Sequence, residues 1–152
     1  MRDAPDYRLW PPVALGLPLV AGVIATAAGL DPVTAPTAAR PLGYALIAAC
    51  VAWNGWGMTL MARHRTGLLP GQAASTVLER GPFRVSRNPL YVGLTALDAG
   101  LALLWPSFWG LVLVPVGVVL LTWGAILPEE RYLRTKFGSA YTEYAGRVRR
   151  WL

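Results

Sequence analysis

Four long apolar stretches dominate this sequence and limit what it can fold into. They lie at 12–30, 41–62, 89–104 and 107–127. A helix needs about 20 apolar residues to cross roughly 30 Å of hydrocarbon, so each stretch is long enough, or nearly so, to span a membrane. Overall, 55% of the residues are apolar and only 14% are charged, which is far from the balance of a soluble domain. We therefore predict an all-α integral membrane protein with four transmembrane helices.

The spacing of these stretches predicts how the chain is organised. Only Trp105 and Pro106 separate the third stretch from the fourth, which predicts a tight helical hairpin. Pro128 follows the fourth stretch and suits the first turn of a new helix, where its missing N–H costs nothing. We predict a single domain over 1–152, divided into two N-terminal transmembrane helices (1–62), a cytoplasmic loop (63–88), the hairpin (89–127) and an amphipathic tail (128–152).

The tail carries apolar and aromatic residues at helical spacing. They are Tyr141, Tyr144, Val148 and Trp151. With arginines beside them, they predict an amphipathic helix that rests in the headgroup layer. Gly138 is expected to end the preceding helix, and Ser139 to cap this one.

The basic residues are sorted to one side of the predicted membrane spans. All but one of the 14 lie before the first stretch, between the second and third, or after the fourth, and the exception is Arg40. By the positive-inside rule, both termini and the middle loop face the cytoplasm of a multi-pass cell-membrane protein. This sorting accounts for the net charge of +6, so no nucleic-acid partner is expected.

The first stretch has a second interpretation as a secretory signal. Ala25, Thr26 and Ala27 resemble a small-residue cleavage site. The residues before the stretch are a poor match, because Arg2 and Arg8 are offset by acidic neighbours. We favour a retained transmembrane helix.

Glycines mark where helices are expected to approach closely. Gly110, Gly117 and Gly124 recur every seven residues, and Gly93 and Gly100 form a similar stripe on the third predicted helix. In lipid, helix association depends on close packing of small residues. The two stripes are interpreted as matching faces of the hairpin.

Several classes of site are not indicated by the sequence. His64 lies in a basic juxtamembrane cluster, Cys50 is the one cysteine, and no acidic pair is spaced for metal ligation, so no metal is expected. No Gly-rich phosphate loop or Ser/Cys nucleophile paired with histidine is present either.

Polar residues gather at the predicted cytoplasmic ends of the hairpin. Residues 87–93 enter it and Glu129–Glu130 leave it, so the hairpin places them close together. With Phe83 and Tyr91 nearby, this set suits a small zwitterionic ligand that has an aromatic part. The residues alone equally allow Arg87 to anchor a lipid phosphate and the glutamates to stabilise the first turn of a helix.

Two segments carry a family resemblance. Residues 81–93 read GPFRVSRNPLYVG, and 129–144 read EERYLRTKFGSAYTEY. In order and spacing they resemble the C-terminal half of isoprenylcysteine carboxyl methyltransferases and phospholipid methyltransferases. The resemblance implies S-adenosylmethionine as cofactor, S-adenosylhomocysteine as product, and methyl transfer to a lipid or lipophilic small molecule at the cytoplasmic membrane surface.

The resemblance also assigns residues. The cofactor-binding positions it implies are Thr76, Val77, Leu78, Phe83, Asn88, Pro89, Leu90, Tyr91, Glu129 and, ranked lower, Glu130. Arg87 and Asp98 are the expected catalytic residues. Asp98 is a lone acid inside the third stretch, on the same helix face as Tyr91, where an intramembrane acid is a functional candidate by default. The alternative for Asp98 is a structural role, such as a bond to Asn54.

Two positions depart from the family pattern. Asn88 stands where the family has histidine, and Ala125 stands where prenylcysteine enzymes have an arginine that meets the substrate carboxylate. A neutral or amine-bearing acceptor is therefore expected. Two rivals remain, namely a sterol- or isoprenoid-type membrane reductase that uses NADPH, and a small four-helix transporter or scaffold.

Overall fold

The structure of the chain is a computed structural model that describes residues 4–33, 37–67 and 70–152. Arg2 lies outside the described residues. Over these ranges the regular elements are all helical, which confirms the predicted all-α class. The α-helices are α1 (Pro11–Ala27), α2 (Arg40–Arg63), α3 (Pro89–Leu104), α4 (Phe108–Leu121), α5 (Leu127–Phe137) and α6 (Ser139–Arg147).

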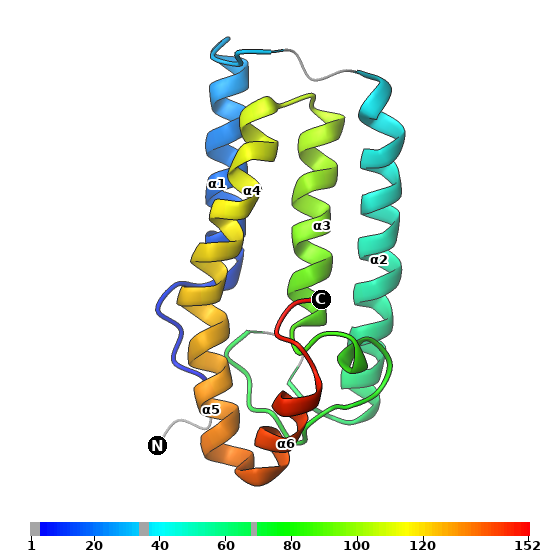
Figure 1. Cartoon of the computed structure of the whole chain (residues 1–152), viewed down its shortest axis with the longest axis vertical. Coiled ribbons are helices and arrows are strands. Elements are labelled where there is room, and N and C mark those ends of the chain that lie inside the picture. Colours follow the sequence, from blue (N-terminus) through cyan, green and yellow to red (C-terminus); the bar gives the residue numbers. More distant parts are fainter. Residues whose placement is uncertain (1–3, 34–36, 68–69) are drawn as a thin grey trace.

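The first four helices run side by side, with α3 between α4 and α2 (Figure 1). Helix α5 continues α4 beyond the bundle, and it meets the 64–88 loop and α6 at one end. Two helical segments, Thr37–Arg63 and Phe108–Phe137, are long and apolar enough to cross a membrane, while Pro11–Ala27 and Pro89–Leu104 are shorter apolar helices. All four predicted spans are thus helical. Two of them belong to helical segments that are long and apolar enough to cross a membrane.

Local sequence explains where these helices begin. Prolines occupy the first turns of α1, α2 and α3, where a missing N–H breaks no helical bond. Helix α4 begins differently, because the buried Ser107 Oγ accepts a 2.8 Å hydrogen bond from the Gly110 N–H. The short turn before α4 therefore ends in a side-chain cap, which fixes the hairpin.

Glycines mark close helix contacts, but not between the pair of helices that we predicted. A Cβ at Gly22 of α1 would lie 2.5 Å from the backbone N of Gly110 on α4, and one at Gly100 of α3 would lie 2.9 Å from the Gly43 carbonyl of α2. The α4 stripe therefore packs on α1 and the α3 stripe packs on α2. The predicted match between the two stripes is wrong, because a glycine stripe shows that a neighbour comes close without showing which neighbour.

We expect Gly22→Ala to destabilise the bundle by about 1–3 kcal/mol, because the new methyl group would overlap the α4 backbone. The matched control is Gly16→Ala on the same helix, where nothing lies within 4 Å of the added carbon. Thermal unfolding in detergent measures both variants. Equal midpoints would contradict the α1–α4 contact.

A π-helical turn, η3 (Thr122–Ile126), joins α4 to α5. Pro128, in the first turn of α5 as predicted, has no N–H to offer the Gly124 carbonyl four residues earlier. That carbonyl instead accepts backbone hydrogen bonds from Arg8 (2.8 Å) and Leu9 (3.1 Å). The chain before α1 is thereby attached to the α4–α5 junction.

The C-terminal tail differs from the single amphipathic helix predicted over its aromatic residues. Helix α5 ends before Gly138 as expected, but α6 stops at Arg147 and Val148 is extended. Tyr141 and Tyr144 are buried inside the protein, at 2% and 3% exposure. The chain after α6 turns back toward the start of α3 (Figure 1). There the Arg87 N–H donates a hydrogen bond to the Arg149 carbonyl.

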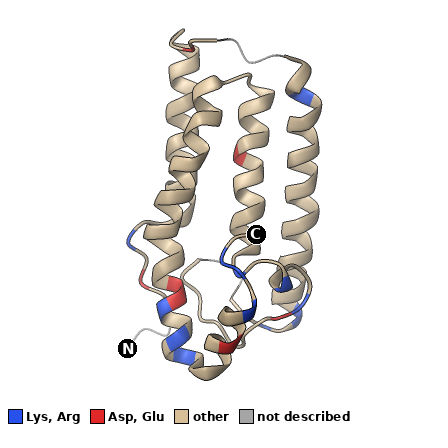
Figure 2. Cartoon of the chain, viewed as in Figure 1, with Lys and Arg blue, Asp and Glu red and all other residues tan. Residues whose placement is uncertain are grey.

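Charged residues gather at the end of the bundle that holds α5, α6 and the 64–88 loop (Figure 2). Arg40 begins α2 at the opposite end. The sorting of charge along the sequence is therefore a sorting in space.

Candidate functional site

A cavity of about 290 Å³ lies at the charged end of the bundle. The ends of α2, α3 and α5, the 64–88 loop, α6 and the chain before α1 all contribute to its walls. The predicted site residues that line it are Thr76, Val77, Leu78, Phe83, Arg87, Asn88, Pro89, Leu90, Tyr91 and Glu129. The structure thus brings together ten of the predicted residues, and leaves Glu130 and Asp98 outside the lining.

Glu129 is the acidic side chain among the cavity-lining residues. Its Oε2 accepts hydrogen bonds from the hydroxyl groups of Tyr91 (3.2 Å) and Tyr7 (3.4 Å). Its Oε1 has no hydrogen-bond donor among the described residues. One oxygen is therefore held by the protein, and the other is available to a ligand.

Aromatic side chains form much of the wall. Tyr144 donates to the Phe83 carbonyl at 2.7 Å, and the Ala74 N–H donates to the Tyr132 hydroxyl at 3.2 Å. Burial raises the pKa of Tyr141 to about 12, and burial followed by the Glu129 charge raises the pKa of Tyr7 above its usual range. These phenols are protonated at neutral pH and act as donors beside flat apolar rings.

Glu130 points away from the cavity into a buried ion-pair cluster. Arg87 donates to its Oε1 at 2.9 Å, and Arg150 contacts both of its oxygens at 2.8 and 2.9 Å. Arg87 also donates to the Ala145 carbonyl at 2.7 Å. Although Arg87 lines the cavity, its guanidinium joins α5 to α6, so its contacts are those of a positioning residue.

Asn88, at the position of the family histidine, contacts the C-terminal segment. Its side-chain amide donates to the Arg150 carbonyl at 2.9 Å, and the Ser86 hydroxyl donates to the same carbonyl at 3.2 Å. The neighbouring Arg87 N–H donates to the Arg149 carbonyl at 2.9 Å. The Asn88 side chain therefore holds the C-terminal segment against the start of α3.

Asp98 is buried on α3, at 9% exposure, and it lies outside the cavity lining. Asn54, suggested as its partner, donates instead to the Leu90 carbonyl at 3.2 Å and contacts Cys50 Sγ at 3.7 Å. No hydrogen bond to Asp98 is present among the described residues. The proposed bond between Asp98 and Asn54 is therefore not formed.

Ala125 is fully buried in the apolar core with Ala14, Leu15 and Leu121. It does not line the cavity. An arginine expected at this position to meet an acceptor carboxylate would point into the core in this fold. The argument from position 125 about the acceptor is thus not supported by the geometry.

Sequence reasoning missed several cavity residues. They are Tyr7, Asn54, Tyr132, Tyr141 and Tyr144. The spacing of Tyr141 and Tyr144 was a usable signal, but we assigned that face to the headgroup layer. Tyr7 had no local signal, because its place depends on the Gly124 carbonyl far along the chain.

The geometry defines an all-helical, apolar bundle with an aromatic and acidic cavity at its charged end. A family model described as phospholipid methyltransferase matches residues 38–140. The match runs from the start of α2 into α6 and covers more than half of the sequence, so the chain belongs to the phospholipid methyltransferase family. No curated protein and no solved structure matches the chain.

Proposed function

We propose that this protein transfers a methyl group from S-adenosylmethionine to a lipid or lipophilic small molecule at the cytoplasmic surface of a membrane. The observation that carries the proposal is Glu129, whose free oxygen opens into an aromatic cavity. Most of that cavity is built from the segment matched by the family. Methyl transfer is the chemistry that membership of this family implies.

The cavity has the features that this cofactor needs. Its volume of about 290 Å³ lies just below the range of ligand pockets, which is roughly 300–1,000 Å³. Glu129 Oε1 can accept from an ammonium or ribose hydroxyl group, and the rings of Phe83 and Tyr91 can pack against an adenine or a cation. When bound, the cofactor supplies a methyl group activated by a positively charged sulfur.

The protein's share of the chemistry is to bind, orient and exclude water. We assign cofactor binding to 76–78, Phe83, 88–91 and Glu129. The ion pair between Glu130 and Arg87 stabilises the segments that carry these residues. Holding two reactants in an attack geometry can supply about 7–11 kcal/mol of the barrier, so little covalent work is left to side chains.

The lining favours a neutral or amine-bearing acceptor. Among the described residues that line the cavity, Arg87 is the basic one, and the Ala145 carbonyl and Glu130 already engage its two terminal nitrogens. A carboxylate buried there without a partner would cost several kcal/mol.

An amine acceptor must release a proton before its lone pair attacks the methyl carbon, as the C–S bond breaks and the N–C bond forms. We propose that Asp98, which lies deeper on α3 and outside the cavity lining, is the final acceptor of that proton. Asp98→Asn should then lower kcat while leaving the affinity for S-adenosylhomocysteine unchanged. If kcat is also unchanged, Asp98 is structural.

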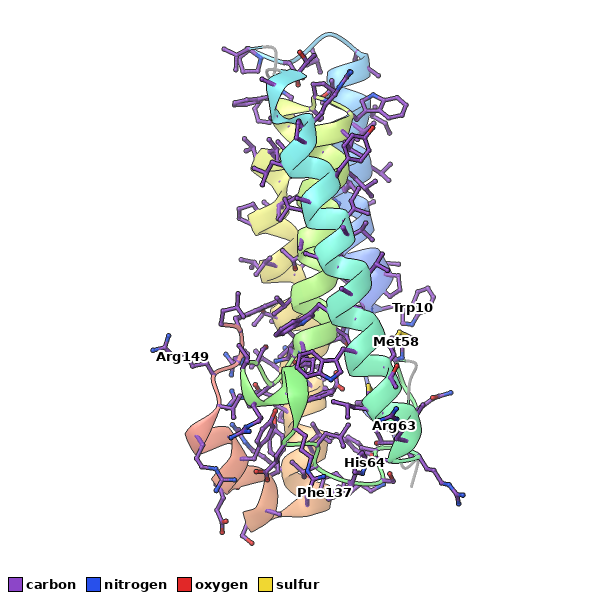
Figure 3. All side chains as sticks on the ribbon, turned by 90° about the vertical axis from the view of Figure 1, so that its right-hand side faces the viewer. Trp10, Met58, Arg63, His64, Phe137 and Arg149 are labelled. Atoms are coloured by element: carbon purple, nitrogen blue, oxygen red, sulfur yellow. The ribbon has the colours of Figure 1, made fainter. Side chains whose placement is uncertain are left out.

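We further propose that all four apolar helices cross the membrane, with both termini and 63–88 in the cytoplasm. The sorting of basic residues supports this orientation. Trp10 projects from the start of α1 near the level of Met58, while Arg63 and His64 lie farther along at the end of α2 (Figure 3). An exposed tryptophan between the apolar and basic zones is typical of a membrane interface.

Cysteine labelling tests the topology. In a Cys50→Ala background, we expect Ser75→Cys to react with a membrane-impermeant maleimide only after the cells are opened. Thr37→Cys, at the opposite end of the bundle, should react in intact cells. Labelling of Ser75→Cys from outside would overturn this topology.

Cofactor identity tests the function itself. We expect S-adenosylhomocysteine to raise the thermal unfolding midpoint of the detergent-solubilised protein, and NADPH to leave it unchanged. The opposite result would favour the reductase, and no effect of either ligand would favour a transporter or scaffold. A methyl-transfer assay that compares extracted membrane lipids with a farnesyl-cysteine analogue then defines the acceptor class.

A further inference from the structure

The chain before α1 is docked on the α4–α5 junction by several independent contacts. The backbone N–H groups of Arg8 and Leu9 both donate to the Gly124 carbonyl. A Cβ at Gly124 would lie 2.5 Å from Leu9 Cβ, so the close approach requires glycine. The Arg8 guanidinium carbon lies 5.1 Å from the centre of the Trp123 ring. This segment, residues 5–9, has a defined position beside the cavity.

Docking the segment places Tyr7 between two walls of the cavity. Its hydroxyl donates to Glu129 Oε2 at 3.4 Å and accepts from the Gly71 N–H at 3.3 Å. Glu129 belongs to α5, whereas Gly71 belongs to the 64–88 loop. One phenol therefore joins three parts of the chain that are far apart in the sequence.

We propose that Tyr7, which lies outside the segment matched by the family, is a positioning residue of the methyl-donor site. It holds the Glu129 carboxylate so that Oε1 faces the cavity, and it holds the part of the loop around Gly71 against the cavity. The inference rests on the proposed function, because it assigns the cavity to the methyl donor. Tyr91 shares the carboxylate, so loss of Tyr7 should weaken the site without abolishing it.

The hydroxyl distinguishes this role from simple packing. The Tyr7 ring also packs against the apolar core, and that contact alone would need only a ring. Tyr7→Phe keeps the ring and removes both hydrogen bonds. If Tyr7 acts only through packing, this variant should behave like the wild type.

The first measurement is the affinity for S-adenosylhomocysteine by calorimetry. We expect Tyr7→Phe to bind about three- to tenfold more weakly, the range expected for a lost hydrogen bond. Tyr44→Phe, at an exposed tyrosine on α2, is the matched control and should bind normally. In a Glu129→Gln background, Tyr7→Phe should cause little further loss, because Tyr7 acts through that carboxylate. An unchanged affinity in Tyr7→Phe would overturn the proposal.

The second measurement needs no ligand. In a Cys50→Ala background, a cysteine at Thr76 on the cavity wall reports access to the cavity through its reaction rate with a soluble maleimide. We expect Tyr7→Ala to speed this reaction severalfold. Gly124→Ala should do the same, because it displaces Leu9 without touching the cavity. Tyr44→Ala should have no effect.

The two measurements separate the possible failures. If the wild type does not bind S-adenosylhomocysteine, the proposed function is wrong, and the labelling rates still decide whether Tyr7 closes the cavity. The other outcome is that the wild type binds S-adenosylhomocysteine but Tyr7→Ala does not change the labelling rate of the cysteine at Thr76. In that case Tyr7 does not close the cavity, so the inference is wrong while the proposed function stands.

Discussion

Arg87→Gln should lower the free energy of unfolding by about 3–5 kcal/mol, the usual cost of removing one partner of a buried ion pair. The Arg87 and Glu130 side chains are 10% and 4% exposed and lie 2.9 Å apart. Without Arg87, the Ala145 carbonyl also loses its side-chain donor, and Glu130 keeps side-chain hydrogen bonds from Arg150 only. The hydrogen bonds that join α5, α6 and the C-terminal segment are weakened together.

Arg134→Gln is the matched control, since Arg134 pairs with the same glutamate. Its side chain is 52% exposed and its distance to Glu130 is 3.8 Å, so the expected loss is below about 1 kcal/mol. Both variants can be compared by thermal unfolding in detergent. If Arg87→Gln is no less stable than Arg134→Gln, the buried cluster does not hold the tail.

Methyl-transfer kinetics of Arg87→Gln address the predicted catalytic role of Arg87. A positioning residue loses activity together with stability, and a second-site stabilising change should restore both. A catalytic residue would lose kcat in a protein that remains as stable as the wild type.

The membrane-type helices were predictable because their signal is local. Apolar composition and length define 12–30, 41–62, 89–104 and 107–127, and each of these ranges is mostly helical in the structure. Prolines at the helix starts sharpen the boundaries. The meeting of the Arg87–Gly93 and Glu129–Glu130 segments also followed from the sequence, since a hairpin returns its two ends to one side.

Other parts of the site depend on contacts between distant residues. Nothing near Tyr7 predicts that it reaches Glu129, because its position follows from Pro128 having no N–H and from the lack of a side chain at Gly124. The sequence likewise does not indicate that Glu129 lines the cavity while Glu130 forms the buried ion pairs. Adjacent helical residues point in different directions, and only the packing of α6 and the tail decides which glutamate faces the cavity.

The different roles of Glu129 and Glu130 lead to the prediction with the largest effect on binding. Glu129→Gln should weaken S-adenosylhomocysteine binding by about 1.5–3 kcal/mol, roughly 10- to 150-fold in Kd, as expected for a lost charge-assisted hydrogen bond. The amide oxygen of glutamine can still accept from Tyr7 and Tyr91, so the unfolding midpoint without ligand should stay close to that of the wild type.

The control for this experiment is Glu143→Gln, which removes the same charge from an exposed position on α6. Calorimetric titration of both proteins with S-adenosylhomocysteine separates the local effect from the change in net charge. We expect normal affinity in Glu143→Gln and weak affinity in Glu129→Gln. If a well-folded Glu129→Gln protein binds as tightly as the wild type, the free oxygen of Glu129 does not contact the cofactor, and the donor must be held by the aromatic and backbone groups of the cavity instead.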